Sequence, residues 1–146
     1  MIDIWNDVVR DGDAFPQRDL LNERSAAEFF AAQSYCGVAV DDDGSVCGLY
    51  ILHPNNVGRC GHICNASYAV AKAVRGCGIG EALVRDCMTA AVGCGYKILQ
   101  FNAVVADNTA ARRLYEKLGF IQLGTIKGGF RADGGYKDIC PYYITL

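Results

Sequence analysis

The sequence has no long hydrophobic run, no excess charge of one sign and no cluster of basic residues. No window approaches the roughly 18 consecutive apolar residues of a membrane-spanning helix, and no basic leader precedes an apolar run at the start. Fourteen Lys and Arg residues stand against sixteen Asp and Glu residues, and no basic stretch is dense enough to contact a nucleic-acid backbone. These absences argue against membrane and nucleic-acid partners and predict a cytoplasmic protein.

Nothing in the sequence marks a boundary between domains. It contains no internal repeat, no low-complexity tract and no Pro- or Ser-rich linker. With 146 residues, 51% of them apolar, the chain is long enough to form one domain with a hydrophobic core and too short to form two domains of ordinary size. We therefore predict a single domain over residues 1–146 with one functional site.

Cysteine is abundant, with eight residues, but its pattern does not predict a disulfide scaffold. Most of the cysteines stand singly in apolar runs, where a free thiol behaves as a small hydrophobic group. One cluster, Cys60-Gly61-His62-Ile63-Cys64, leaves a zinc site open as an alternative. Because its spacing is not C-x2-C and no second Cys/His pair follows, we expect reduced thiols and no metal.

Hydrophobic periodicity predicts helices and strands in a definite order. An apolar face beginning at Ile4 predicts a helix that ends near Gly12, and a second helix is predicted around residues 25–33 with Ser25 as its cap. Later apolar stripes predict helices that begin near Ile79 and Asn108. The predicted strands are residues 35–40, 46–52, 63–71, 96–105, 120–126 and 136–145. The order ααβββαβαββ predicts an α/β (α+β) fold with a mixed sheet and helices on both faces.

A glycine-rich loop, Arg75-Gly76-Cys77-Gly78-Ile79-Gly80, lies between a predicted strand and a predicted helix. This arrangement directs several backbone N–H groups to one point, where the helix dipole also favours an anion. Gly76, Gly78 and Gly80 would let a diphosphate approach the amides, and Arg75 offers a charge-assisted contact. In an isolated Gly-x-Gly, the glycines more often serve only to allow unusual backbone angles. The spacing of the surrounding residues therefore has to distinguish a phosphate-binding loop from an ordinary turn.

The spacing excludes two common phosphate-binding motifs. A dinucleotide-binding G-x-G-x-x-G would need glycine where Glu81 or Leu83 stands, and a phosphate loop would need Gly-Lys-Ser or Gly-Lys-Thr. The loop instead resembles the Arg/Gln-x-x-Gly-x-Gly/Ala signature of the GNAT superfamily of acyl-CoA-dependent N-acetyltransferases, matched by Arg75, Gly78 and Gly80. Residues 107–120 are similar to the second hallmark of that family, Asn-x-x-Ala-x-x-Leu-Tyr-x-x-x-Gly-Phe.

The resemblance, which extends from about Tyr35 to the C-terminus, implies two central strands, residues 63–71 and 96–105, that splay apart like a V. The pantetheine arm of acetyl-CoA, the implied co-substrate, then pairs with backbone groups that the splay leaves free. The oxyanion would face a backbone N–H near residues 68–70, where the strand of family members carries a bulge. The implied cofactor-binding residues are Tyr68, Val70, Arg75, Gly76, Cys77, Gly78, Ile79, Gly80 and Asn108.

The reaction implied by the resemblance is direct transfer of the acetyl group to a primary amine of a small molecule or amino acid, in a ternary complex. Tyr115 corresponds to the tyrosine that the family places beside the sulfur of CoA. It is the candidate general acid, because a phenol with a pKa of about 10 can protonate a departing thiolate. Tyr115 also fits the apolar stripe of its helix, and Asn108 also fits as a helix cap, so these structural roles stay open.

The general base and the acceptor site are less well specified. Residues 63–68 contain no carboxylate, although many relatives place a glutamate on this strand, so Asp138, His62 and ordered water are the candidates. Arg131 and Tyr136, between the last two predicted strands, are candidates for lining the acceptor site. Their segment resembles the closing hairpin of relatives that act on small amines or amino acids, which favours such an acceptor over a protein terminus.

The sequence departs from the family pattern at its start, because it opens on a predicted helix where relatives have a short strand. The strand at residues 35–40 then forms an exposed sheet edge, which is a template for pairing with another chain, and a homodimer is one expected outcome. Two functional alternatives stay open. One is a catalytically weak acyl-CoA-binding or regulatory module, and the other is a protein N-terminal or lysine acetyltransferase.

Overall fold

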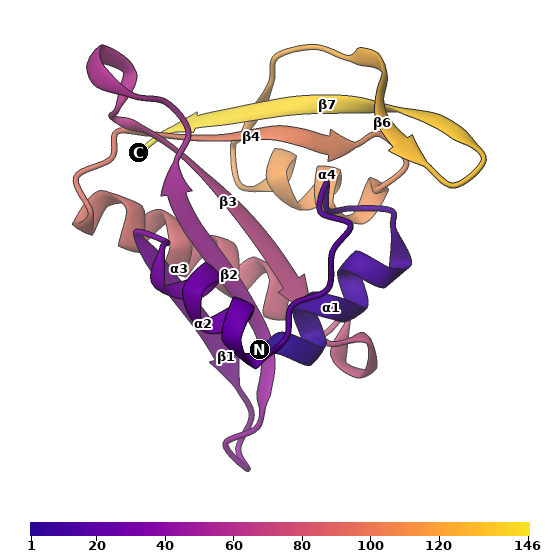
Figure 1. Ribbon diagram of the computed structural model, residues 1–146. Coiled ribbons are helices and arrows are strands. Elements are labelled where there is room, and N and C mark those ends of the chain that lie inside the picture. The colour runs from indigo at the N-terminus through magenta and orange to yellow at the C-terminus, as the bar shows by residue number, and fades with distance from the viewer.

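The computed structural model describes residues 1–146, and its helices lie on both faces of a twisted mixed sheet (Figure 1). This confirms the predicted fold class and most of the predicted order. The helices are α1 (Ile2–Asp11), α2 (Glu23–Ala31), α3 (Ile79–Gly93) and α4 (Thr109–Lys117). The strands are β1 (Tyr35–Val40), β2 (Val46–Pro54), β3 (Ile63–Val70), β4 (Ile98–Val105), β5 (Ile121–Gln122), β6 (Ile126–Ala132) and β7 (Gly135–Thr145).

The sequence prediction is wrong about the end of the chain. In place of one strand over residues 120–126, the structure has the two-residue β5, and the stretch predicted as turns contains β6, which pairs with β7. Two glycines hide β6 in the sequence, since Gly128 has a φ of 63° and the register of the β6–β7 pair shifts between Ile126 and Phe130. The observed order is therefore ααβββαβαβββ.

The cap of α2 also differs from the prediction. Asn22 is the N-cap residue, because its side-chain oxygen accepts from the Ser25 N–H at 2.9 Å while the Ser25 hydroxyl accepts from the Asn22 N–H at 2.9 Å. Ser25 is thus the third helical residue of a capping box. The sequence prediction was three residues late because it assigned the cap to the serine.

The sheet has the strand order β1-β2-β3-β4-β7-β5, and β6 also pairs with β7. The parallel neighbours β3 and β4 share only the pairs Ile63↔Ile98 and Cys64↔Leu99, after which they separate. Strand β3 stays paired with β2 over its whole length, and β4 stays paired with β7. Figure 1 shows the resulting V between β3 and β4, as predicted for splayed central strands.

Two hydrophobic cores cover the two faces of the sheet. On one face α3 and α4 pack against fully buried side chains of β2, β4 and β7, including Leu52, Leu99 and Tyr142. On the other face α1 and the segment after it pack on β2 and β3 around Trp5, whose ring lies 4.4 Å from that of Phe15. Each face of the sheet therefore carries a hydrophobic core. The gap between β3 and β4 opens through the sheet from one face to the other.

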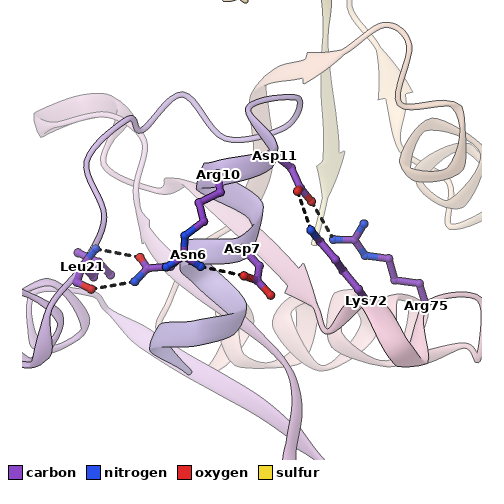
Figure 2. Close-up of polar contacts among 7 residues, drawn as sticks. All are labelled: Asn6, Asp7, Arg10, Asp11, Leu21, Lys72 and Arg75. Atoms are coloured by element: carbon purple, nitrogen blue, oxygen red, sulfur yellow. Dashed lines mark hydrogen bonds and ion pairs between the residues drawn. The ribbon is translucent and has the colours of Figure 1, made fainter.

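The segment between α1 and α2 is held in place by a buried asparagine (Figure 2). Asn6 is 5% exposed, and its carboxamide both donates to the Leu21 carbonyl and accepts from the Leu21 N–H, each at 2.8 Å. We expect Asn6→Ala to lower the free energy of unfolding by about 2–4 kcal/mol, because two buried backbone groups lose their partners. Chemical denaturation measures this, with Asp7→Ala on the exposed side of α1 as control. A loss below about 0.5 kcal/mol would contradict the anchoring role.

Three further expectations concern thiols, membranes and the sheet edge. All eight cysteines are free, as predicted, and the buried Cys64 thiol donates to the Ile98 carbonyl at 3.2 Å.

None of the four helices combines the length and the apolar character needed to cross a membrane. Strand β1 forms an edge of the sheet with Val38 and Val40 exposed, and pairing of a second copy there stays a prediction.

Candidate active site

A groove of about 580 Å³ opens where β3 and β4 separate. Residues of both strands line it, together with the glycine loop, the start of α3, the exposed turn before α4 and one side of α4. Ala14, Phe15 and Pro16, from the opposite face of the sheet, line it as well. The groove therefore connects the face that carries α3 and α4 with the face that carries α1 and α2.

Strand β3 presents half of its backbone to this groove. The hydrogen bonds at the two ends of the β2–β3 ladder involve Ile63 and Ala71, each at 2.9 Å. In an antiparallel pair, residues that bond to the partner strand alternate with residues whose backbone groups point away. The odd-numbered residues of β3 thus bond to β2, and those whose N–H and C=O groups face the groove are Ala66, Tyr68 and Val70.

The bulge that the resemblance implies near residues 68–70 does not occur in β3. Its register with β2 runs without a shift from Gly48↔Val70 to Pro54↔Cys64. The irregularity lies instead in β4, between Phe101 and Val104, where the pairing with β7 shifts. Because β3 keeps its full ladder, the distortion that opens the groove falls on β4.

The glycine loop leaves its backbone amides open. Gly76 and Gly78 have φ angles of 82° and 84°, and a β-carbon on either would meet no heavy atom within 4 Å. The first hydrogen bond of α3 runs from the Ala82 N–H to the Gly78 carbonyl at 3.1 Å, and the N–H groups of residues 76–78 donate to no protein acceptor. Those of Ile79 and Gly80 lie in the first helical turn, where no intrahelical acceptor exists.

Arg75 is held at the edge of this loop by α1 (Figure 2). Its Nε donates to the Val70 carbonyl at 3.2 Å, and its Nη2 lies 3.8 Å from a carboxylate oxygen of Asp11, which also pairs with Lys72 at 2.7 Å. Half of the Arg75 side chain remains exposed. The sequence prediction missed Asp11, because nothing local places the end of α1 beside a loop more than sixty residues later.

Tyr115 and Asn108 both line the groove from the side of α4. Tyr115 is 9% exposed, its ring centroid lies 4.5 Å from that of Phe101, and its hydroxyl has no protein partner. Burial raises the pKa of Tyr115 above the ordinary tyrosine value. Asn108 caps α4, since its Oδ1 accepts from the Ala111 N–H at 3.1 Å. The predicted capping role of Asn108 is thus observed.

The two residues proposed as general bases do not line the groove. His62 is exposed just before β3, and Asp138 pairs with Lys127 at 2.7 Å. That ion pair, with a further hydrogen bond from the Gly128 N–H, holds the pKa of Asp138 below its usual value. The side chains of Cys60, His62 and Cys64 do not converge, because Cys64 is fully buried and the other two are exposed.

One carboxylate, Glu81, does line the groove, but its negative charge is balanced by two cationic side chains. Glu81 pairs with Lys117 at 2.6 Å and with Arg85 at 2.8 Å. Hydrogen bonds from these two residues lower the pKa of Glu81, so it is ionised and engaged. The uncharged polar side chains that line the groove on β3 and β4 are Asn65, Ser67, Tyr68 and Asn102.

A second cavity of about 440 Å³ adjoins the groove on the α1 face, and Phe15 and Pro16 line both spaces. It lies between the end of α1, the segment after it and the β6–β7 hairpin. Of the two residues predicted for the acceptor site, Arg131 lines this cavity. Tyr136 is 72% exposed and lines neither space.

Comparison with known proteins agrees with this geometry. Residues 2–120 match the model of the acetyltransferase (GNAT) family. The chain is 36% identical over 118 residues to the N-acetyltransferase aca1 of Schizosaccharomyces pombe, covering 80% of this chain and 56% of that protein. The chain thus spans about half the length of the curated relatives it matches.

Solved structures show the same fold. A GCN5-related N-acetyltransferase from Kribbella flavida superimposes with a TM-score of 0.89 at 33% identity, over 100% of this chain and 90% of the other. A GNAT superfamily phosphinothricin acetyltransferase from Sinorhizobium meliloti, in complex with acetyl-CoA, superimposes with a TM-score of 0.91 at 21% identity, over 99% and 80%. The resemblance read from the two sequence motifs is confirmed: the chain belongs to the GNAT acetyltransferase family.

Proposed function

We propose that this chain is an N-acetyltransferase that binds acetyl-CoA in the groove and passes the acetyl group directly to a primary amine in a ternary complex. The observation that carries the proposal is the conjunction of open amides in the glycine loop with a gap between β3 and β4. The amides suit a diphosphate, and the gap suits an extended chain with amides of its own. The solved relative that contains acetyl-CoA has this fold, which supports the choice of ligand.

The cofactor is assigned to the groove in two parts. Its diphosphate accepts hydrogen bonds from the N–H groups of residues 76–80, and the exposed side of the Arg75 guanidinium supplies positive charge. Its pantetheine arm lies along β3 and pairs with the backbone of Tyr68 and Val70. The Val70 carbonyl is already taken by Arg75, so the arm uses the Val70 N–H and the two backbone groups of Tyr68.

The thioester then lies between β3 and Tyr115. The lone pair of the acceptor nitrogen attacks the thioester carbonyl carbon, and the resulting oxyanion accepts a hydrogen bond from a β3 backbone N–H near Tyr68. The C–S bond breaks, and the thiolate takes a proton from the Tyr115 hydroxyl, which its raised pKa keeps protonated. The ammonium proton leaves through ordered water, which returns a proton to the Tyr115 phenolate. Glu81 does not take it, because it is the one carboxylate along the groove and is held by two cations.

A small-molecule acceptor fits this site better than a protein terminus. The second cavity adjoins the groove at Phe15 and Pro16, between the α1–α2 segment and the β6–β7 hairpin. Its volume of about 440 Å³ suits a compact ligand. A protein with the same fold is named for the acetylation of phosphinothricin, a small molecule, which supports the choice of a small acceptor. A protein acceptor would have to thread an extended terminus past Phe15 and Pro16.

Release of free thiol from acetyl-CoA, measured over a panel of small amines, amino acids and short peptides, tests the proposal. We expect thiol release that depends on at least one amine and matches formation of its N-acetyl product by mass spectrometry. Tight binding of acetyl-CoA in calorimetry without transfer to any amine would instead establish a non-catalytic acyl-CoA-binding module. Peptides acetylated faster than every small amine would establish the protein acetyltransferase alternative.

A further inference from the structure

The lining of the second cavity contains more cationic than anionic side chains. Three arginines line it, Arg10, Arg18 and Arg131, against one carboxylate, Asp133. Arg10 pairs with Asp7 at 2.9 Å, but Arg18 and Arg131 have no carboxylate within ion-pair distance. Two exposed guanidinium groups from separate segments, one on the α1–α2 segment and one on β6, thus line the same solvent-open cavity.

The position of the cavity connects it to the transfer reaction. Phe15 and Pro16 separate it from the groove and line both, so a molecule seated there reaches the groove past these two side chains. Neither arginine lines the groove itself. The two arginines therefore lie outside the groove assigned to acetyl-CoA and beside its entrance at Phe15 and Pro16.

Resting on the function proposed above, we infer that the acceptor is a carboxylate-bearing amine of the amino-acid class, bound through its carboxylate by Arg18 and Arg131. A guanidinium grips a carboxylate with two parallel N–H···O bonds, which fixes orientation as well as position. With the carboxylate so held, the amine points toward the groove. An amine without the carboxylate keeps the reactive nitrogen but loses the hydrogen bonds to Arg18 and Arg131.

Kinetics with matched acceptors tests this inference. L-amino acids that act in the thiol-release assay are compared with their α-amides, which keep the amine and lose the negative charge. We expect kcat/KM for the free acid to exceed that for the amide by at least about 10-fold. Arg18→Gln with Arg131→Gln lowers kcat/KM for the acid by about 10- to 100-fold, mostly through KM, and leaves the amide within about 2-fold.

The control variant is Arg59→Gln, which removes an exposed arginine that lines neither space and should change no parameter. The inference is overturned if amides react as well as free acids, or if the double variant slows both equally. If no amine is acetylated at all, the proposed function fails and saturation-transfer NMR with CoA-loaded protein decides. Binding of the acid alone, lost in the double variant, supports the inference, and equal signals from acid and amide overturn it.

Discussion

Replacing Gly78 by valine is expected to weaken acetyl-CoA binding by about 100-fold, equivalent to about 2.8 kcal/mol. Gly78 is the residue before α3 and has a φ of 84°, a conformation that a β-branched residue adopts only with strain. Its β-carbon position is now open space on the side where the diphosphate is assigned. A valine there would both turn the amides away and occupy the phosphate position.

Gly44→Val is the matched control for this experiment. Gly44 has a φ of 79°, also with no heavy atom within 4 Å of a β-carbon, and it lies in the β1–β2 turn outside the groove. The two variants carry a similar backbone strain, so both should melt at a lower temperature than the parent. Calorimetric titration with acetyl-CoA should separate them, with only the Gly78 variant losing affinity. Equal affinities would remove the glycine loop from the cofactor site.

Removal of the Tyr115 hydroxyl should reduce kcat about 100-fold while the dissociation constant of acetyl-CoA changes less than 2-fold. General acid catalysis contributes about 10²–10⁴ to a rate, and the hydroxyl is assigned to the proton that the thiolate accepts. Tyr115→Phe keeps the ring, which packs on Phe101 and Phe120, so the groove keeps its shape. A loss in kcat with unchanged affinity is the signature of a group that acts in the transition state.

Tyr96→Phe provides the comparison for this variant. Tyr96 is 8% exposed, and its hydroxyl bonds to that of Ser34 at 2.7 Å, away from the groove. Losing that hydroxyl should affect stability and leave kcat unchanged. Unchanged turnover in Tyr115→Phe would exclude the acid role and leave this residue as part of the apolar core.

The pH dependence of the parent enzyme gives a second readout on Tyr115. Burial raises its pKa, so the acid form persists through the neutral range and up to at least the ordinary tyrosine value of about 10. The kcat should therefore show no decline from this group between pH 7 and 9. A decline in kcat in that range, lost in the phenylalanine variant, would show that the phenol ionises too easily for the assigned role.

The parts of this protein that the sequence predicted are those governed by local patterns. The apolar runs of β1 and β2 with the Asp-Gly turn between them, the glycine loop and the start of α3 at Ile79 follow from local residue types and from glycines with special backbone angles. The resemblance carried by the two family motifs predicted a groove between β3 and β4, where the structure has it. The walls formed by the glycine loop, β3, β4 and α4 were predictable because each belongs to such a local signal, whereas the wall formed by Ala14, Phe15 and Pro16 was not.

The parts that the sequence did not predict depend on contacts between distant segments. Strand β6 forms in an exposed, glycine-containing stretch because β7 supplies its hydrogen-bonding partners. The register shift next to the groove lies in β4, in its pairing with β7, and β3 has none. Asp11 reaches Arg75 only through the packing of α1 on the sheet. Arg18 and Gln17 carry no motif, and the fold alone brings them to the wall of a cavity opposite Arg131.

A crystal structure of the protein with bound CoA would show whether CoA occupies the groove between β3 and β4. We expect diphosphate oxygens within about 3 Å of the backbone nitrogens of residues 76–80, with the pantetheine arm extended between the two strands. We also expect the thiol end close to the Tyr115 hydroxyl. CoA bound elsewhere, with the loop amides unengaged and the gap between the two strands unfilled, would exclude this groove as the acetyl-CoA site.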